Sequence, residues 1–265
     1  TGLKEQEMTP EEKFKFDLEG YLLIKNVLSP GEVAALNEVA DRVFPRNFDE
    51  EGEGFKGRKG LRRTSKVSAW SSETQALIDH PNAVPYLIAL LGSKFRIDHD
   101  YCIFMQDCPN GGRLHGGPGG HGGSQRKYLF INGEMLNGLT VLTYFLSDAK
   151  VGDGGFACVP GSHKTNCREH LPDDVIRFER IPDYVVQPEV EAGDALIFTE
   201  ALVHGTMPWT AEHERRTFLY KYTPGNLVHS LNYYDQDDYT DLTEQQKRVM
   251  APPSSGGRPN VVEEA

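Results

Sequence analysis

Two histidines stand in a glycine-rich stretch whose composition is suited to metal binding. Residues 114–123 run Leu-His-Gly-Gly-Pro-Gly-Gly-His-Gly-Gly, so His115 and His121 lie in a segment too rich in glycine for a helix or a regular strand. Glycine has no Cβ, and the backbone of such a loop can therefore approach a bound group closely. Loops of this kind usually carry a carboxylate two residues after the histidine, but here those positions are Gly117 and Gly123.

A second set of candidates lies about ninety residues later, where His204 falls within a predicted strand. Thr206 follows two residues later and is expected on the same face of that strand. Arg215 and Arg216 then open the next strand. Neighbouring residues of a strand point to opposite sides, so only one of the two arginines can face the cavity that holds His204.

These residue types predict a particular chemistry. Neutral imidazoles with an open coordination sphere suit Fe(II). A guanidinium at the floor of the same cavity is suited to bind a carboxylate through two hydrogen bonds, and a threonine hydroxyl can add a third. The combination indicates an iron site at which a carboxylate-bearing co-substrate binds.

The elements that must position these residues are mostly short strands separated by glycine turns. Proline and an acid after Thr9 and after Ser29 predict two N-terminal helices. We therefore expect a mainly β protein with a double-stranded β-helix (jelly roll, cupin-like) core and N-terminal and flanking α-helices. Strands are expected at 21–27, 94–105, 139–146, 156–159, 184–190, 195–198, 203–208 and 217–222, and further helices at 80–92 and 241–250.

Length and composition limit the function classes. The 265 residues are expected to form a single domain over 1–251 and a flexible tail over 252–265. A formal net charge of −11 argues against nucleic-acid or anionic-membrane partners. The longest apolar run, 84–91, is too short to cross a bilayer, and no signal segment or C-x-x-C pair is recognisable. We therefore expect a cytoplasmic protein.

The segment 47–66 changes from acidic to basic and contains several glycines. It is interpreted either as a solvated loop or as a lid that offers cations such as Arg62 and Arg63 to a small anionic substrate. Trp70, Tyr101 and Phe104 are candidates for lining the substrate pocket. His163 is expected to have a structural role in its turn.

Three pieces of the chain together resemble the phytanoyl-CoA dioxygenase family, whose members are non-haem Fe(II)- and 2-oxoglutarate-dependent oxygenases with a jelly-roll core. These pieces are the entry segment 16–24, the Gly-Gly-Phe-Ala-Cys-Val-Pro-Gly-Ser-His-Lys segment 154–164, and the stretch 193–215. The resemblance implies that His204 binds iron and that Arg215, rather than Arg216, binds the tail of 2-oxoglutarate, with Thr206 beside it. The second histidine ligand would be His115, or His121 as the alternative. Such an enzyme uses molecular oxygen to oxidise an unactivated C–H bond of a small molecule.

The chain departs from the family at the carboxylate ligand. The family pattern is His-x-Asp or His-x-Glu, whereas Gly117 follows His115 here, and Asp107 and Glu134 stand at the wrong spacing. Three interpretations follow. The enzyme hydroxylates or otherwise oxidises its substrate with water or a distant acid completing the site. Alternatively, it is a halogenase in which chloride binds iron in the space beside Gly117. Finally, it is a relative that binds small molecules without catalysis.

Overall fold

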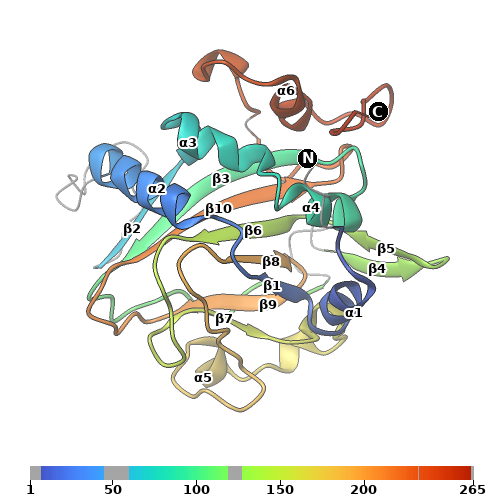
Figure 1. Ribbon diagram of the computed structural model, residues 1–265. Helices are drawn as coiled ribbons and strands as arrows, with labels where there is room; N and C mark the ends of the chain where they lie inside the picture. Colours follow the sequence, from blue (N-terminus) through green and yellow to red (C-terminus); the bar gives the residue numbers. More distant parts are fainter. Residues whose placement is uncertain (1–6, 45–59, 119–126, 232, 264–265) are drawn as a thin grey trace.

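The computed structural model describes residues 7–44, 60–118, 127–231 and 233–263, and its centre is a six-stranded antiparallel sheet (Figure 1). In spatial order the strands are β1 (Tyr21–Ile24), β8 (Ala195–Thr199), β6 (Thr140–Phe145), β10 (Arg215–Thr223), β3 (Arg96–Met105) and β2 (Leu61–Ser65). Neighbouring strands of this sheet therefore come from distant parts of the chain. Of the candidate residues, Arg215 and Arg216 belong to this sheet, on β10.

A smaller sheet packs against one face of the main sheet. It consists of β7 (Gly155–Val159) and β9 (Val203–Met207), and its Phe156 lies 4.9 Å, ring centre to ring centre, from Phe198 of β8. Two antiparallel sheets packed face to face around such an apolar layer confirm the predicted jelly-roll-like core. A separate hairpin joins β4 (Tyr128–Ile131) to β5 (Glu134–Asn137) through Asn132-Gly133, both with positive φ, as a two-residue hairpin turn requires.

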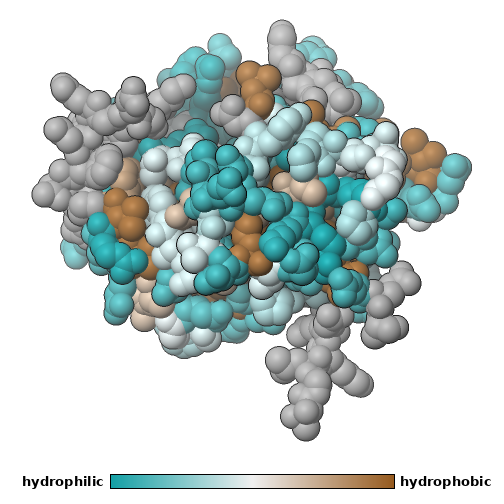
Figure 2. All heavy atoms as spheres, turned by 90° about the horizontal axis from the view of Figure 1, so that it is seen from above, coloured by the Kyte–Doolittle hydropathy of each residue, from teal (hydrophilic) through white to brown (hydrophobic). Residues whose placement is uncertain are grey.

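Helices cover the other face of the main sheet (Figure 1). Capping boxes begin the first two helices at Thr9 and Ser29, as the sequence predicts. Over these helices the surface is largely hydrophilic, with hydrophobic residues in small separate patches (Figure 2). The α-helices are α1 (Pro10–Glu19), α2 (Pro30–Val43), α3 (Ser72–Gln75), α4 (Val84–Leu91), α5 (Asp173–Ile176), which lies by the small sheet, and α6 (Glu244–Met250). The 3-10 turns are η1 (Val67–Ala69), η2 (Ala76–Asp79), η4 (Ser162–Lys164), η5 (Arg168–His170) and η6 (Gln236–Asp238).

Alternation along β10 decides which of its side chains face the space between the two sheets. Phe218 and Tyr220 belong to the apolar cluster under the helices, whereas Leu219 belongs to the cluster between the sheets. Because side chains alternate along a strand, Arg215 and Lys221 lie on the same face as Leu219. A buried guanidinium and a mostly buried ammonium, 12% exposed, therefore point to the side of the sheet that faces β7 and β9.

Three expectations need correction. Residues 184–190 form no continuous strand, because Pro188 interrupts the run, and contribute only isolated bridges at Val186 and Val190. The helix expected over 80–92 begins only at Val84. The segment from 252, expected to be a loosely held tail, packs on the domain: Arg258 donates hydrogen bonds to the carbonyls of Lys94 and Arg248. Within the described ranges, no helix has the length and apolarity needed to span a membrane.

Candidate active site

His115 and His204 are brought together by their own backbones. The N–H of His115 donates to the carbonyl of His204 at 2.8 Å, and the reverse bond measures 2.9 Å. This narrow antiparallel pairing places the two imidazole centres 4.3 Å apart. The glycine-rich loop is therefore joined to β9 at the residue that carries the second histidine. The alternative ligand, His121, lies outside the described residues.

The hydrogen bonds of the two rings fix the nitrogen that each offers to a metal. Nδ1 of His115 donates to the carbonyl of Arg113 at 2.9 Å, and Nδ1 of His204 donates to the carbonyl of Leu202 at 2.8 Å. A carbonyl only accepts, so each neutral ring keeps its lone pair on Nε2. Burial lowers the pKa of His204 to about 4, which keeps this ring in the neutral, metal-binding form at neutral pH.

A carboxylate that the sequence analysis missed lies beside this pair. Glu200 is buried in the turn between β8 and β9, and its Oε1 lies 4.0 Å from Nε2 of His204. Lys221 donates to the same oxygen at 2.5 Å. Burial alone would raise the pKa of Glu200, but the adjacent ammonium of Lys221, which donates a hydrogen bond to it, holds this pKa well below its usual range. The sequence offered one signal for this residue: an acid, Glu200, stands four positions before His204, the candidate ligand.

Arg215 and Arg216 point to opposite faces of the main sheet. Arg215 is buried between the sheets, and its Nε has no hydrogen-bond partner among the described residues. Burial lowers its pKa to about 10, so the guanidinium stays charged at neutral pH. Arg216 points to the helical side, where it forms ion pairs with Asp41 at 2.5 Å and Glu214 at 2.7 Å. Only Arg215 is therefore placed to bind a group inside the jelly roll.

Two threonines add polar atoms to the same interior. Thr206 pairs directly with Phe156 across β7 and β9, and Phe156 stacks on His204 at 6.2 Å, so Thr206 shares the face of the histidine. Thr143 of β6 pairs with Leu219 of β10. Its Oγ1 is buried and has no hydrogen-bond partner in the described part of the chain. Unpaired buried polar atoms are rare in proteins, so Thr143 and Arg215 mark a place where a polar ligand fits.

The glycines after His115 are required by close packing. A Cβ on Gly116 would lie 2.4 Å from the carbonyl oxygen of Leu202. Gly117 has a φ of +95°, and a Cβ there would lie 2.8 Å from Cγ of Arg168. Because the side-chain direction of Gly117 is filled by Arg168, the structure gives no support to a chloride site in that space.

Replacing Gly117 with aspartate is therefore expected to destabilise the chain by roughly 1–3 kcal/mol without tightening iron binding, because the new side chain meets both a positive φ and Arg168. Thermal denaturation and anaerobic Fe(II) titration measure the two effects. Gly133→Asp is a matched control, since Gly133 also has a positive φ but nothing within 4 Å of its Cβ position. Tighter iron binding by Gly117→Asp would contradict this placement.

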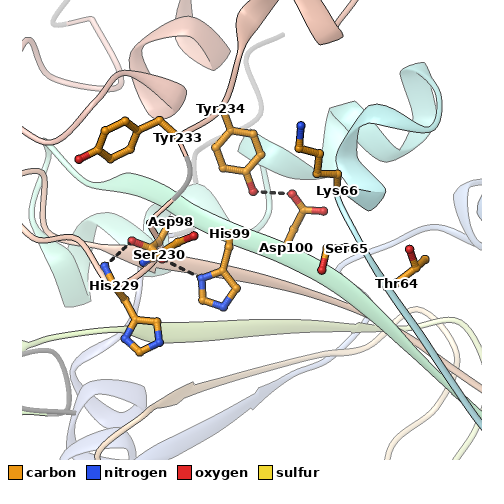
Figure 3. A pocket seen from close by; sticks show the side chains of 10 residues that line it. All are labelled: Thr64, Ser65, Lys66, Asp98, His99, Asp100, His229, Ser230, Tyr233 and Tyr234. Atoms are coloured by element: carbon orange, nitrogen blue, oxygen red, sulfur yellow. Dashed lines mark hydrogen bonds and ion pairs between the residues drawn. The ribbon is translucent and has the colours of Figure 1, made fainter. Parts of the chain in front are cut away.

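A cavity of about 540 Å³ opens beside Asp98, His99 and Asp100 of β3 (Figure 3). The imidazoles of His99 and His229 lie on one side of it, 5.7 Å apart, and Tyr234 donates to Asp100 on the other. The cavity is lined by Thr64, Ser65, Lys66, Asp98, His99, Asp100, His229, Ser230, Tyr233 and Tyr234. Most of these side chains form hydrogen bonds, which suits a polar ligand better than an apolar one.

A continuous series of contacts links this cavity to the histidine pair. The ring of His99 stacks on Tyr101 at 6.0 Å, and the ammonium of Lys221 lies 5.3 Å from the centre of the Tyr101 ring. Lys221 in turn binds Glu200, which lies beside His204. His99, Tyr101, Lys221 and Glu200 therefore connect the cavity with the candidate metal site.

The residues expected to form a lid and to line the substrate pocket do not lie together in the structure. Residues 45–59 lie outside the described ranges. Arg62 belongs to β2 and binds Glu214 at 2.6 Å, so it is a structural cation rather than part of a lid. Arg63 stacks on Tyr101 at 3.9 Å, on the interior side. Phe104 of β3 packs in the cluster under the helices, Trp70 at the end of η1 packs against the same cluster, and neither is among the residues that line the cavity.

Comparison with known proteins agrees with the geometry. Residues 16–217 match the family model described as phytanoyl-CoA dioxygenase (PhyH). The chain belongs to the phytanoyl-CoA dioxygenase family. It is thus an enzyme of the Fe(II)- and 2-oxoglutarate-dependent oxygenases, as the sequence resemblance predicted. None of the curated proteins matches the chain.

Several solved structures share the fold of this dioxygenase-family chain. HygX from Streptomyces hygroscopicus with nickel, 2-oxoglutarate and hygromycin B bound has a TM-score of 0.70 at 24% identity, covering 83% of this chain and 89% of HygX. The epimerase SnoN in complex with Fe³⁺, alpha ketoglutarate and nogalamycin RO has a TM-score of 0.63 at 19% identity, covering 94% and 96%. The carbocyclase SnoK from nogalamycin biosynthesis gives 0.62 at 19%, covering 85% and 88%. At these identities the likeness shows the fold.

The residues present fit the groups that the family uses. Two neutral imidazoles with adjacent Nε2 lone pairs form half of an iron site, and the unpaired Nε of Arg215 is a donor without a partner among the described residues. A third ligand is not preassembled: within the described ranges, no three His, Cys, Asp or Glu side chains are gathered closely enough to hold a metal. The glycine at residue 117 leaves the loop without the carboxylate of the family pattern.

Proposed function

We propose that this dioxygenase-family member hydroxylates an unactivated C–H bond of a small polar molecule. His115 and His204 would hold Fe(II), and Arg215 with Thr206 would bind the distal carboxylate of 2-oxoglutarate. The overall reaction consumes R–H, O₂ and 2-oxoglutarate and yields R–OH, succinate and CO₂. The observation that carries this proposal is the pairing of two correctly oriented imidazoles with a buried arginine inside one jelly roll.

The residues of the chain have separate tasks in this reaction. When bound, iron supplies the activation of molecular oxygen. The carbonyls of Arg113 and Leu202 orient the two imidazoles through Nδ1. Arg215 and Thr206 orient the co-substrate, since a charged donor and a hydroxyl together fix a carboxylate in direction as well as position. The rings of Phe156 and Phe198 beside His204 exclude water from one side of the site.

The cavity supports a polar substrate with several hydroxyl or amino groups. Its lining includes Asp98 and Asp100, while Lys66 is the only ammonium or guanidinium group among the described residues that line it. This lining is compatible with a small-molecule substrate. It offers little support for the anionic substrate that the basic segment 47–66 suggested. HygX with hygromycin B and SnoN with nogalamycin RO are solved complexes of relatives with natural products, which is the class of compound we propose.

Hydroxylation is favoured over halogenation by two contacts. Arg168 fills the space beside Gly117 in which chloride would bind, and the buried carboxylate of Glu200 lies next to His204. A non-catalytic relative would keep the 2-oxoglutarate site without consuming oxygen. The non-catalytic alternative differs from the other two in leaving the co-substrate unconsumed, and halogenation differs from hydroxylation in its product, so an assay that follows both succinate and the product separates all three.

The test begins with anaerobic binding of 2-oxoglutarate to the Fe(II)-loaded chain, followed by oxygen and a panel of natural products rich in hydroxyl and amino groups, with chloride present. We expect succinate formation coupled to a product heavier by one oxygen atom, labelled when ¹⁸O₂ is used. Tight binding of 2-oxoglutarate without oxygen consumption would favour the non-catalytic relative. A chlorinated product would favour halogenation. Absence of 2-oxoglutarate binding would refute the proposal itself.

A further inference from the structure

Glu200 is the buried group that the family pattern leaves without a role. Its side chain is 4% exposed, and it faces His204 and Lys221 rather than solvent. Ionising a carboxylate in such a position has a large desolvation cost, which a protein structure tolerates when the charge is paired or binds a metal. Its presence next to the histidine pair, in a chain whose glycine loop has lost the carboxylate, is the observation to be explained.

The distances are compatible with metal ligation. Adjacent ligand atoms in an octahedral site with bonds of roughly 2.1 Å are about 3 Å apart, and opposite ones about 4.2 Å apart. Oε1 of Glu200 lies 4.0 Å from Nε2 of His204, so a movement of about 1 Å brings it to an adjacent position. A glutamate side chain in a turn can make this movement by a small change of its torsion angles.

The surrounding backbone holds Glu200 against the histidine loop. The N–H of Glu200 donates to the carbonyl of Leu139 at 2.9 Å, which anchors the turn to the main sheet. On the other side, a Cβ on Gly116 would lie 3.1 Å from the carbonyl oxygen of Glu200. The glycine after His115 therefore lets the loop pack directly on the turn that carries the acid.

We infer that Glu200 replaces the missing carboxylate and is the third protein ligand of the iron, with Lys221 as its positioning residue. This inference rests on the proposed iron site of His115 and His204. A carboxylate has two oxygens and about four lone pairs, so it can accept a hydrogen bond from Lys221 and bind a metal at the same time. The ligand set is thus the usual two histidines and one acid, with the acid supplied by the β8–β9 turn instead of the loop.

A simpler role would be that Glu200 only neutralises the buried ammonium of Lys221. Removing the acid would then weaken metal binding indirectly, because an uncompensated cation would repel Fe(II). The two roles differ when both charges are removed together. Glu200→Gln combined with Lys221→Met leaves no unpaired buried charge, so metal affinity should return only if Glu200 is not a ligand.

The experiment is an anaerobic titration of the full chain with Fe(II), and with Co(II) as a spectroscopic probe of the coordination sphere. We expect Glu200→Gln to weaken metal binding about 100-fold or more, beyond the 10- to 100-fold typical of groups that only support a ligand. The double variant should remain equally weak, and the Co(II) spectrum should change in both. Wild-type affinity in the double variant would overturn the inference.

Two further arms keep the test decisive. If the double variant does not fold, Glu200→Ala is titrated with and without formate, which can supply a carboxylate to the emptied position. We expect formate to raise the metal affinity of Glu200→Ala but not of the wild-type chain, and no formate effect would overturn the inference. If the wild-type chain binds neither metal, the proposed function fails as well. If the wild-type chain binds metal and the Glu200 variants bind it with the same affinity, the proposed function stands and the role of Glu200 as a ligand is refuted.

Discussion

Replacing Arg215 with methionine is expected to weaken 2-oxoglutarate binding strongly and, in the absence of the co-substrate, to make the chain more stable. Arg215 is buried, and its Nε has no partner among the described residues, so the folded chain bears the desolvation cost without full compensation. Methionine of similar length should raise the free energy of unfolding by roughly 1–3 kcal/mol. Loss of a buried charged partner should weaken 2-oxoglutarate binding by about 30-fold to several thousand-fold.

The adjacent arginine provides the control for this prediction. Arg216→Met removes ion pairs with Asp41 and Glu214 and a hydrogen bond to Asn37, so it should lower the free energy of unfolding by about 1–2 kcal/mol. Its 2-oxoglutarate affinity should remain that of the wild type. Denaturant unfolding and anaerobic calorimetry of both variants measure the two quantities. Equal loss of 2-oxoglutarate binding in both variants would contradict the assignment of the inward arginine.

The features predicted correctly from the sequence are those with a local cause. A threonine or serine, a proline and an acid three residues after the cap specify the starts of α1 and α2 without reference to the rest of the fold. Strand alternation by itself requires that Arg215 and Arg216 face opposite sides. Glycine-rich sequence around His115 correctly indicated a loop, because close contacts such as Gly116 against Leu202 exclude any side chain.

The features that were missed depend on strand register. Glu200 and Lys221 are 21 residues apart, and nothing local in either segment indicates that they form an ion pair. Their contact arises because β8 and β10 both pair with β6, which places the end of one beside the end of the other. Phe104 was misassigned for a related reason, since the sequence did not reveal which face of β3 turns toward the helices, and Trp70, which follows η1, packs against the same cluster.

This dependence on register also explains how the acid of the site can change its position in the chain. A loop ligand and a turn ligand occupy the same region when the loop is paired with the strand that follows the turn, as His115 is with His204. The position of a carboxylate in the sequence can then change while its position in space is kept. Absence of an acid at residue 117 therefore does not predict absence of an acid at the iron.

Replacing His115 with alanine is expected to weaken Fe(II) binding by more than about 100-fold, whereas His121→Ala should leave it unchanged. The reason is geometric: His115 lies beside His204 through a pair of backbone hydrogen bonds, and its ring is turned by the carbonyl of Arg113 so that Nε2 is the metal-binding atom. Losing a direct ligand should exceed the 10- to 100-fold effect of losing a supporting group. Anaerobic titration with Fe(II) and Co(II) measures the affinities.

His204→Ala serves as the positive control, because that histidine is buried next to Glu200 and should be as necessary as His115. His170→Ala serves as the negative control, because its side chain is 77% exposed and pairs only with the neighbouring Glu169 among the described residues. A loss of binding in His121→Ala with retention in His115→Ala would transfer the ligand role to the later histidine. That result would also remove the reason for placing the iron beside Glu200, because it is the backbone pairing of His115 with His204 of β9 that positions the metal site there.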